Sequence, residues 1–330
     1  MMSRSSSVPV AGNAAFTHAT GMVRKPRALL AGGQFMPFAP ASPAEPSRID
    51  SGIAELVRLG FRAADRTLFA NDGYFAGTAD SRSADFAAAL ERQDIDAIVG
   101  VRGGYGSNYI LDSLEISSPE NPKIVLGFSD LTSLHIFMWQ RYGWVTFHGP
   151  MLAAGFDAGA GATNGYDQKS LLAALQKTDG GWTLGLDGEA LAPGEAQGRL
   201  LGGCLTLVET TLRTPWELET DGAILVLEDR GMKPWQVDRA LMHLMQAGKF
   251  KGVRGILLGD FPECESPVKG SPAVRDVCRR ILSPLGVPVM YGAPVGHTER
   301  PALTLPLGVN ARMTAKGEGL VEILEPAVMA

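Results

Sequence analysis

The stretch from Ile124 to His135 constrains the fold more than any other part of the sequence. Ile124 to Leu126 are typical of a short buried strand, and from Asp130 onward apolar residues recur at helical spacing. Gly127-Phe128-Ser129-Asp130 joins the two segments. A serine between a strand end and a helix start is typical of a nucleophile elbow. From this stretch alone an N-cap of the helix is the favoured interpretation of Ser129, because the second glycine of G-x-S-x-G is missing.

The same alternation of short apolar strands and helices extends along both halves of the chain. Short apolar strands that alternate with helices favour parallel sheets covered on both faces. We therefore predict an α/β protein, with strands at 29–39, 62–68, 95–101, 124–126, 144–147, 223–227, 253–258 and 287–291 and a closing hairpin at 309–313 and 320–324. Helices are predicted at 83–92, 108–114, 130–142, 168–176, 204–212, 235–246 and 272–282.

The length of 330 residues suits two domains. A Gly/Ala-rich, aperiodic stretch at 153–163 separates the two series of strands and helices. The residues before 27 are rich in Ser, Ala, Gly and Thr, which is typical of a disordered tail. We predict a tail at 1–26, an N-terminal domain at 27–152, a linker or crossover at 153–195 and a C-terminal domain at 196–330.

Composition excludes several classes of function. A net charge of -5 leaves no basic footprint for nucleic acid. No apolar run approaches the roughly 18 residues that a membrane span needs. Three cysteines, an odd number without metal-ligand spacing, suit a reducing compartment, and we expect a cytoplasmic protein without a metal or another cofactor.

A second candidate feature is the loop Arg102-Gly103-Gly104-Tyr105-Gly106, which follows the strand at 95–101. Its glycines allow backbone N–H groups to approach a ligand, although a plain turn would have the same composition. No Lys-Ser/Thr pair follows, so a Walker-type nucleotide site is not expected. Ligands bind at the carboxyl ends of parallel strands, where both this loop and Ser129 are expected to lie.

A serine nucleophile needs a base and an acid, and the residues alone leave the choice open. His148 ends a strand at the ligand-binding edge, and His297 lies in a glycine-flanked loop. His18 falls in the tail, whereas His135 and His243 lie on helices. Glu228 follows five apolar strand residues and could orient an imidazole, and Asp229 and Asp260 are rivals on the same argument.

Four blocks, in this order and spacing, resemble the LD-carboxypeptidase family, serine peptidases of murein recycling that include the microcin C immunity peptidases. The resemblance extends from about Lys25 to Pro306. The blocks are Phe38-Ala39-Pro40-Ala41-Ser42-Pro43, the Arg102 to Gly106 loop, Pro122-Lys123 through Gly127-Phe128-Ser129-Asp130-Leu131-Thr132, and Leu227-Glu228-Asp229 with Gly296-His297.

The resemblance implies a fold and a set of roles. Ser129 would be the nucleophile, His297 the general base and Glu228 its orienting acid. The backbone N–H groups of Gly104 and Asp130 would form the oxyanion hole. The family fold is a flavodoxin-like N-terminal domain that carries the serine and a C-terminal domain that carries Glu and His, usually in a homodimer.

Two further residues are candidates for substrate binding. Arg102 is a candidate for the terminal carboxylate by charge and position, and His148 becomes a substrate-side or structural residue. The sequence departs from the family at Cys204, where Asn is frequent, and at Leu212-Arg213-Thr214, where Gly-Thr is common. These departures bear on substrate contacts more than on the chemistry.

The leading expectation is a carboxypeptidase that releases the terminal D-Ala from a murein tetrapeptide. A second hypothesis is an immunity peptidase that cleaves a peptidyl- or aminoacyl-nucleotide amide, with Trp182 as a possible ring to stack on the base. A third is a non-catalytic two-domain binding protein in which Ser129 only caps a helix.

Overall fold

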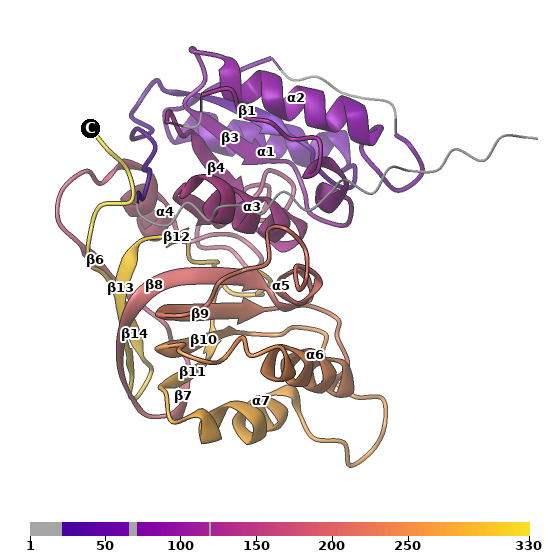
Figure 1. Cartoon of the computed structure of the whole chain (residues 1–330). Helices are drawn as coiled ribbons and strands as arrows, with labels where there is room; N and C mark the ends of the chain where they lie inside the picture. Colours follow the sequence, from indigo (N-terminus) through magenta and orange to yellow (C-terminus); the bar gives the residue numbers. More distant parts are fainter. Residues whose placement is uncertain (1–21, 66–70, 119) are drawn as a thin grey trace, which may run out of the picture.

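The computed structural model describes residues 22–65, 71–118 and 120–330, which form two sheets that lie one above the other in Figure 1. The first sheet has the order β12-β5-β4-β3-β1-β2. Strands β2, β1, β3, β4 and β5 are parallel, in the order of flavodoxin-like folds, and β12 is antiparallel to β5. The strands are β1 Gln34–Phe38, β2 Arg62–Ala63, β3 Ala97–Gly100, β4 Ile124–Gly127, β5 Thr146–His148 and β12 Leu305–Leu307.

Capping residues mark the ends of two helices in the N-terminal half. Helix α2 (Ala79–Glu91) begins after Thr78, whose hydroxyl accepts a hydrogen bond from the Ser81 backbone N–H. Helix α3 (Thr132–Tyr142) ends at Gly143, which adopts the left-handed conformation of a C-cap. The other helical segments are α1 Pro46–Arg58 and the 3-10 helices η1 Ser107–Ile110 and η2 Ser129–Leu131.

The second sheet is mixed, in the order β6-β14-β13-β8-β9-β10-β11-β7. Strands β8 to β11 are parallel, and the strands on both sides of them are antiparallel. The strands are β6 Trp182–Gly185, β7 Glu189–Ala192, β8 Gly194–Cys204, β9 Ala223–Glu228, β10 Gly255–Gly259, β11 Val289–Ala293, β13 Asn310–Ala315 and β14 Leu320–Ile323. This architecture confirms the predicted α/β class, with a parallel sheet in the N-terminal half and a mixed sheet in the C-terminal half.

Helix α3 packs between the two sheets, because it contacts β5 of the first and β8 of the second (Figure 1). Its residue Ile136 belongs to the hydrophobic cluster of the second sheet. Helices α6 (Pro234–Gln246) and α7 (Val274–Leu282) pack against each other beside that sheet. The other helices are α4 Gln168–Gln176 and α5 Leu205–Thr210, and the 3-10 helix η3 spans Ser283–Leu285.

Several segments connect the predicted units. Strands β6 and β7 lie within the predicted linker 153–195 and are part of the second sheet, whereas β12 comes from the predicted C-terminal domain and pairs in the first. One hydrophobic cluster includes residues of both sheets, among them Phe35, Leu126, Leu200 and Val226. Residues 22–26, the described part of the predicted tail, are also bonded to the N-terminal unit, since Arg24 donates its backbone N–H to the Gly143 carbonyl over 2.8 Å. Residues 1–21 and the predicted strand end at 66–68 lie outside the described residues.

No helix in the described ranges is long and apolar enough to cross a membrane.

Candidate active site

Ser129 lies in a sharp turn between a parallel strand and a helix. Strand β4 ends at Gly127, Phe128 is extended, and Ser129 is the first residue of η2, with a φ of 62°. Neither η2 nor α3 has a side-chain cap, so the structure does not support the interpretation of Ser129 as an N-cap. A left-handed conformation at a residue other than glycine costs about 1–2 kcal/mol. Such strain at a strand–helix turn is typical of a nucleophile elbow.

The glycine loop after β3 lies directly against this serine. A Cβ atom on Gly103 would lie 2.8 Å from the Ser129 Oγ, so the close approach requires glycine there. Gly104 has a φ of +104°, and a Cβ on it would lie 2.4 Å from the Ser42 Oγ. The loop is therefore enclosed between Ser42 and Ser129, with Gly103 against Ser129 and Gly104 against Ser42.

Asp130 fixes the position of the backbone that follows Ser129. Its side chain is buried, and its Oδ2 accepts a hydrogen bond from the Ser107 backbone N–H over 2.7 Å. The Ser107 hydroxyl donates in return to the Asp130 carbonyl over 2.5 Å. Burial raises the pKa of Asp130, and the hydrogen bonds from Ser107 oppose this shift only in part.

Sequence reasoning missed a buried arginine that joins the loops around the serine. Arg82 on α2 is 1% exposed and donates hydrogen bonds to the carbonyl groups of Pro40, Gly77 and Gly106. Its guanidinium also lies 4.9 Å from the centroid of the Phe75 ring. Burial lowers the pKa of Arg82. Arg82 directly precedes the helix predicted at 83–92, and nothing in the sequence indicates that it is buried.

Glu228 and His297 form a hydrogen-bonded pair. Glu228 is the last residue of β9 and is fully buried. Its Oε2 accepts one hydrogen bond from the His297 backbone N–H over 2.9 Å and is 2.7 Å from the Nδ1 of the ring. Because the backbone and the ring bind the same oxygen, the loop and the imidazole are oriented together.

Burial and charge act in opposite directions on this pair. Burial disfavours the imidazolium, but the adjacent Glu228 carboxylate outweighs it and raises the pKa of His297. Burial likewise disfavours the carboxylate, but the charge and hydrogen bonds of His297 outweigh it and lower the pKa of Glu228. The pair is therefore arranged to stabilise a proton on the imidazole.

The pair depends on a glycine beside it. Gly296 has a φ of +63°, and a Cβ atom there would lie 2.3 Å from the Glu228 Cδ. We predict that Gly296→Ala displaces the carboxylate from His297 and lowers enzymatic activity by at least about a hundredfold, since a small misplacement of reacting groups can have an effect of that size. Steady-state kinetics on the purified variant measures this.

Gly286→Ala is the matched control for this substitution. Gly286 has a φ of +74° with nothing within 4 Å of an added Cβ, so alanine there imposes backbone strain without a clash. Gly286→Ala should lower the free energy of unfolding by about 1 kcal/mol and leave activity unchanged. Equal activities for the two variants would contradict the steric argument.

The neighbour of Ser129 contacts the histidine. The Phe128 ring lies edge-on to the imidazole of His297, with ring centroids 5.0 Å apart. Both rings line a cavity of about 300 Å³, the lower end of the range for small-ligand sites. Arg48 and Arg230 line the same cavity and were not selected from the sequence; each forms an ion pair, with Asp157 and Glu263 respectively.

The other histidine candidates have different surroundings. His135 is fully buried and its Nε2 lies 2.9 Å from the Gly127 carbonyl; burial lowers the pKa of His135 to about 3. His243 is exposed on α6 and pairs with Glu209. His18 lies outside the described residues.

The rival acids hold loops instead of an imidazole. Asp229 accepts hydrogen bonds from the backbone N–H and the hydroxyl of Thr206, at the start of α5. Asp260 pairs with Arg300 over 2.6 Å and accepts a hydrogen bond from Thr298. Asp260 thereby anchors the loop that begins with His297.

His148 lies behind the Glu228–His297 pair. It is the last residue of β5, is fully buried, and has its Nε2 3.7 Å from the Glu228 Oε1. Burial lowers the pKa of His148. The His148 ring thus faces Oε1 of Glu228, whereas His297 binds the other carboxylate oxygen, Oε2.

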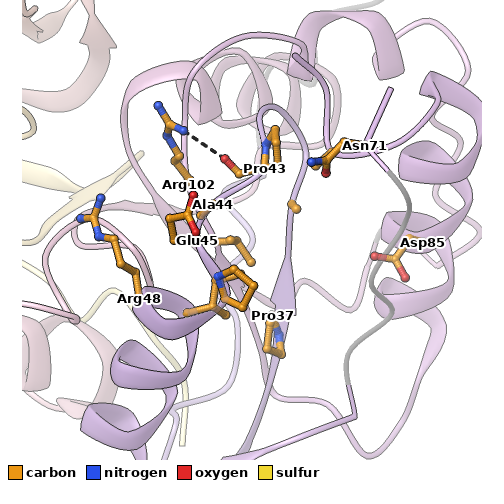
Figure 2. Close-up of a pocket in the computed structure, with 13 residues that line it drawn as sticks. Pro37, Pro43, Ala44, Glu45, Arg48, Asn71, Asp85 and Arg102 are labelled. Atoms are coloured by element: carbon orange, nitrogen blue, oxygen red, sulfur yellow. Dashed lines mark hydrogen bonds between the residues drawn. The ribbon is translucent and has the colours of Figure 1, made fainter. Parts of the chain in front are cut away.

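Arg102 lies at the carboxyl end of β3, where the strand order of the first sheet reverses. Figure 2 shows its guanidinium directed toward Pro43, whose carbonyl accepts a hydrogen bond from Nη1 over 3.0 Å. Arg102 and Arg48 both line a cavity of about 540 Å³ between β1, α1 and the glycine loop. Since Arg48 also lines the cavity beside His297, the two cavities meet at this side chain.

Curated proteins of similar sequence are carboxypeptidases and an immunity protein. The chain is 36% identical over 304 residues to the "Probable murein peptide carboxypeptidase" of Bacillus subtilis (strain 168). These residues cover 90% of this chain and 94% of that protein. It is 28% identical to the "Microcin C7 self-immunity protein MccF" of Escherichia coli, over 84% of this chain and 88% of that protein.

Solved structures share the whole architecture. MccF in complex with glutamyl sulfamoyl guanosine superposes with a TM-score of 0.83 at 25% identity, over 92% of this chain and 99% of that one. Muramoyltetrapeptide carboxypeptidase from Oxalobacter formigenes superposes with a TM-score of 0.78 at 24% identity, over 89% of this chain and 99% of that one. This match shows the shared fold.

The family models match both halves of the chain. Residues 37–149 match the LD-carboxypeptidase N-terminal domain, and residues 197–313 match the LD-carboxypeptidase C-terminal domain. Ser129 and the glycine loop lie within the first range, and Glu228 and His297 lie within the second. The chain therefore belongs to the LD-carboxypeptidase family of peptidases.

Proposed function

We propose that this protein is a serine carboxypeptidase that hydrolyses the L,D amide bond of a murein tetrapeptide and releases the C-terminal D-Ala. The observation that carries the proposal is the position of Ser129. It occupies a strained strand–helix turn next to Phe128, whose ring contacts the imidazole of the buried Glu228–His297 pair. The 36% identity to a probable murein peptide carboxypeptidase supports the substrate class.

The reaction is an acyl transfer. His297 takes the proton of the Ser129 hydroxyl as that oxygen attacks the carbonyl of the L-residue before the terminal D-residue. Glu228 holds Nδ1–H, which leaves Nε2 as the basic nitrogen, and stabilises the imidazolium that forms. The proton then passes to the leaving amine, the D-amino acid departs, and water hydrolyses the acyl-enzyme with His297 again as base.

The oxyanion would be bound by backbone N–H groups of Gly104 and Asp130. The glycine loop lies against Ser129, and the Asp130 backbone is held by Ser107. Each such donor contributes about 3 kcal/mol to the stability of the transition state. Because both donors are backbone groups of fixed loops, they would need no reorganisation during the reaction.

Arg102 is proposed to bind the terminal carboxylate of the substrate. Arg102 is exposed beside the glycine loop and donates a hydrogen bond from Nη1 to the Pro43 carbonyl, which leaves the other nitrogens of the guanidinium fork for a carboxylate. We predict that Arg102→Gln raises KM about tenfold or more and changes kcat little, as loss of uniform binding does. Initial rates over a range of tetrapeptide concentrations separate the two constants.

Arg62→Gln is the control for this substitution. Arg62 begins β2, is exposed and donates to a backbone carbonyl, that of Gly32, over 2.7 Å. It therefore resembles Arg102 in charge and bonding but lies at the amino end of its strand, away from the serine. A rise in KM in both variants would assign the effect to net charge and not to a carboxylate site.

The decisive assay is release of D-Ala from L-Ala-D-Glu-mDAP-D-Ala by the purified protein. The tetrapeptide that ends in L-Ala is the matched substrate control, and Ser129→Ala is the enzyme control. Release from the D-terminated peptide alone, and only by the wild type, supports the proposal. No release from either peptide by folded protein would contradict the substrate assignment.

A second candidate is hydrolysis of an aminoacyl-nucleotide amide, favoured by the structural match to MccF bound to glutamyl sulfamoyl guanosine. The suggestion that Trp182 stacks on a base gains no support from its position, because Trp182 lies in β6 opposite Ile323 and packs against the core. Incubation with an aminoacyl sulfamoyl adenosine, followed by chromatography for the released amino acid, distinguishes this activity from the first.

Homodimer formation remains a prediction from the family resemblance, and a cytoplasmic location remains a prediction from the cysteine content. The three free cysteines are buried, which is compatible with a reducing compartment. Sedimentation equilibrium over a range of protein concentrations tests the dimer.

A further inference from the structure

A group of buried polar atoms lies behind the proposed catalytic pair. In the described part of the chain, Glu228 Oε1 and both ring nitrogens of His148 are buried and have no hydrogen-bond partner. His148 Nε2 and Glu228 Oε1 face each other at 3.7 Å. Buried polar atoms normally pair, because an unpaired one loses its interaction with water without compensation. The two groups are therefore complementary to each other.

The His148 ring is held in place from several sides. Its backbone lies between two strands, opposite Gly127 of β4 and Leu305 of β12. The rings of Phe128 and His135 lie 6.1 and 6.4 Å from it, centroid to centroid. His148 belongs to the first sheet and Glu228 to the second. The contact thus joins the sheet that carries Ser129 to the strand that carries the acid.

The chemistry of the contact follows from the groups that face His148. These are Glu228 from β9, His297 from the loop after β11 and His135 from α3. Burial lowers the pKa of His148 against the opposing effect of the Glu228 carboxylate, and the repulsion of His297 adds a smaller lowering. A neutral imidazole carries one N–H. With that proton on Nε2, the ring presents a donor to the Glu228 oxygen that His297 leaves free.

We propose that His148 is a positioning residue for Glu228. Its N–H faces Oε1 and keeps the carboxylate in the rotation in which Oε2 binds the backbone and Nδ1 of His297. It also stabilises the carboxylate charge while His297 carries the proton from Ser129. This inference rests on the proposed Ser129–His297–Glu228 triad and adds a residue that acts through Glu228 without touching the substrate.

The test compares two substitutions of His148. Gln has an amide N–H as many bonds from the backbone as Nε2 of histidine, whereas Leu has a similar volume and no donor. We expect His148→Leu to lower kcat about tenfold with KM unchanged, because one carboxylate oxygen loses its partner. His148→Gln should restore most of that loss. His243→Gln, at an exposed histidine on α6, should leave kcat unchanged.

A measurement on His297 makes the test independent of turnover. Without the donor at Oε1 the Glu228 carboxylate becomes more basic and stabilises the imidazolium more, so the NMR titration of His297 should shift to higher pH in His148→Leu. It should return toward the wild-type midpoint in His148→Gln. Thermal unfolding of each variant shows whether it is folded at the temperature of the assay.

The outcomes separate the two proposals. If Leu and Gln variants have equal kcat, and the His297 titration does not move, His148 is only a packing residue and the inference is wrong. If Ser129→Ala keeps its activity, the triad itself fails. A shift of the His297 titration that Gln reverses would support the positioning role even if the tetrapeptide is not the substrate.

Discussion

Replacing Ser129 by alanine is expected to lower the rate of amide hydrolysis by at least about 10⁴-fold. The hydroxyl is the atom that forms the acyl-enzyme, so its loss leaves only the contributions of the oxyanion hole and of substrate binding. Single-turnover measurements with the tetrapeptide would show no acyl-enzyme in the variant. Activity within tenfold of the wild type would exclude Ser129 as the nucleophile.

The strain at Ser129 allows a control within the same position. Alanine keeps the unfavourable φ of 62°, whereas glycine adopts it without penalty. Ser129→Gly should therefore be as inactive as Ser129→Ala but more stable to unfolding by about 1 kcal/mol. Urea unfolding of the two variants measures this difference. Ser51→Ala on the exposed face of α1 should change neither activity nor stability appreciably.

Replacing Glu228 by glutamine is expected to lower kcat by a factor on the order of 10⁴. Gln retains the size of Glu but removes the anion, so it neither stabilises the imidazolium nor enforces the tautomer with the proton on Nδ1. The sign of the pH effect follows. The carboxylate raises the pKa of His297 against the opposing effect of burial, so its removal lowers that pKa. The base must be deprotonated, so the acid limb of kcat/KM should move to lower pH.

The control for this variant is Glu325→Gln. Glu325 is partly buried, pairs with Lys25 over 2.6 Å and accepts a hydrogen bond from the Asn310 backbone. Its replacement should lower the free energy of unfolding without moving the acid limb. An acid limb that is unchanged in Glu228→Gln would show that Glu228 does not control the protonation of His297. The shift is opposite to the one expected for His148→Leu, which distinguishes the two positions.

Strands and helices that are marked by an apolar run or by helical periodicity within their own residues could be predicted from the sequence. The apolar run that ends at Gly127 predicts β4, and the periodicity after Asp130 predicts α3. Helix α4 at 168–176 is confirmed at both ends. The strand order that places Gly103 against Ser129 also follows from the general geometry of parallel sheets, in which carboxyl ends share one edge.

Other elements could not be predicted because their stability comes from distant partners. Strand β12 has three residues, includes a proline, and forms only because β5 offers it an edge. Strands β6 and β7 lie in a stretch that resembles a linker, and they pair with β14 and β11 from far along the chain. The predicted helix at 108–114 is shorter, a 3-10 helix at Ser107–Ile110.

The sequence by itself determined the α/β class, the strand–helix junction at Ser129 and a short set of histidines and acids that could assist it. Only the tertiary structure decided which of them meet. A hydrogen bond requires a donor–acceptor distance within a few tenths of an ångström of its optimum, and here the two groups come from segments far apart in the chain. Glu228 and His297 are 69 residues apart and bond over 2.7 Å, whereas Asp229, one residue away, points to Thr206. Glu228 is the last residue of β9 and Asp229 follows it, so side chains that are adjacent in the chain face different partners. Glu228 meets the loop of Gly296 and His297, whereas Asp229 binds Thr206 near the start of α5.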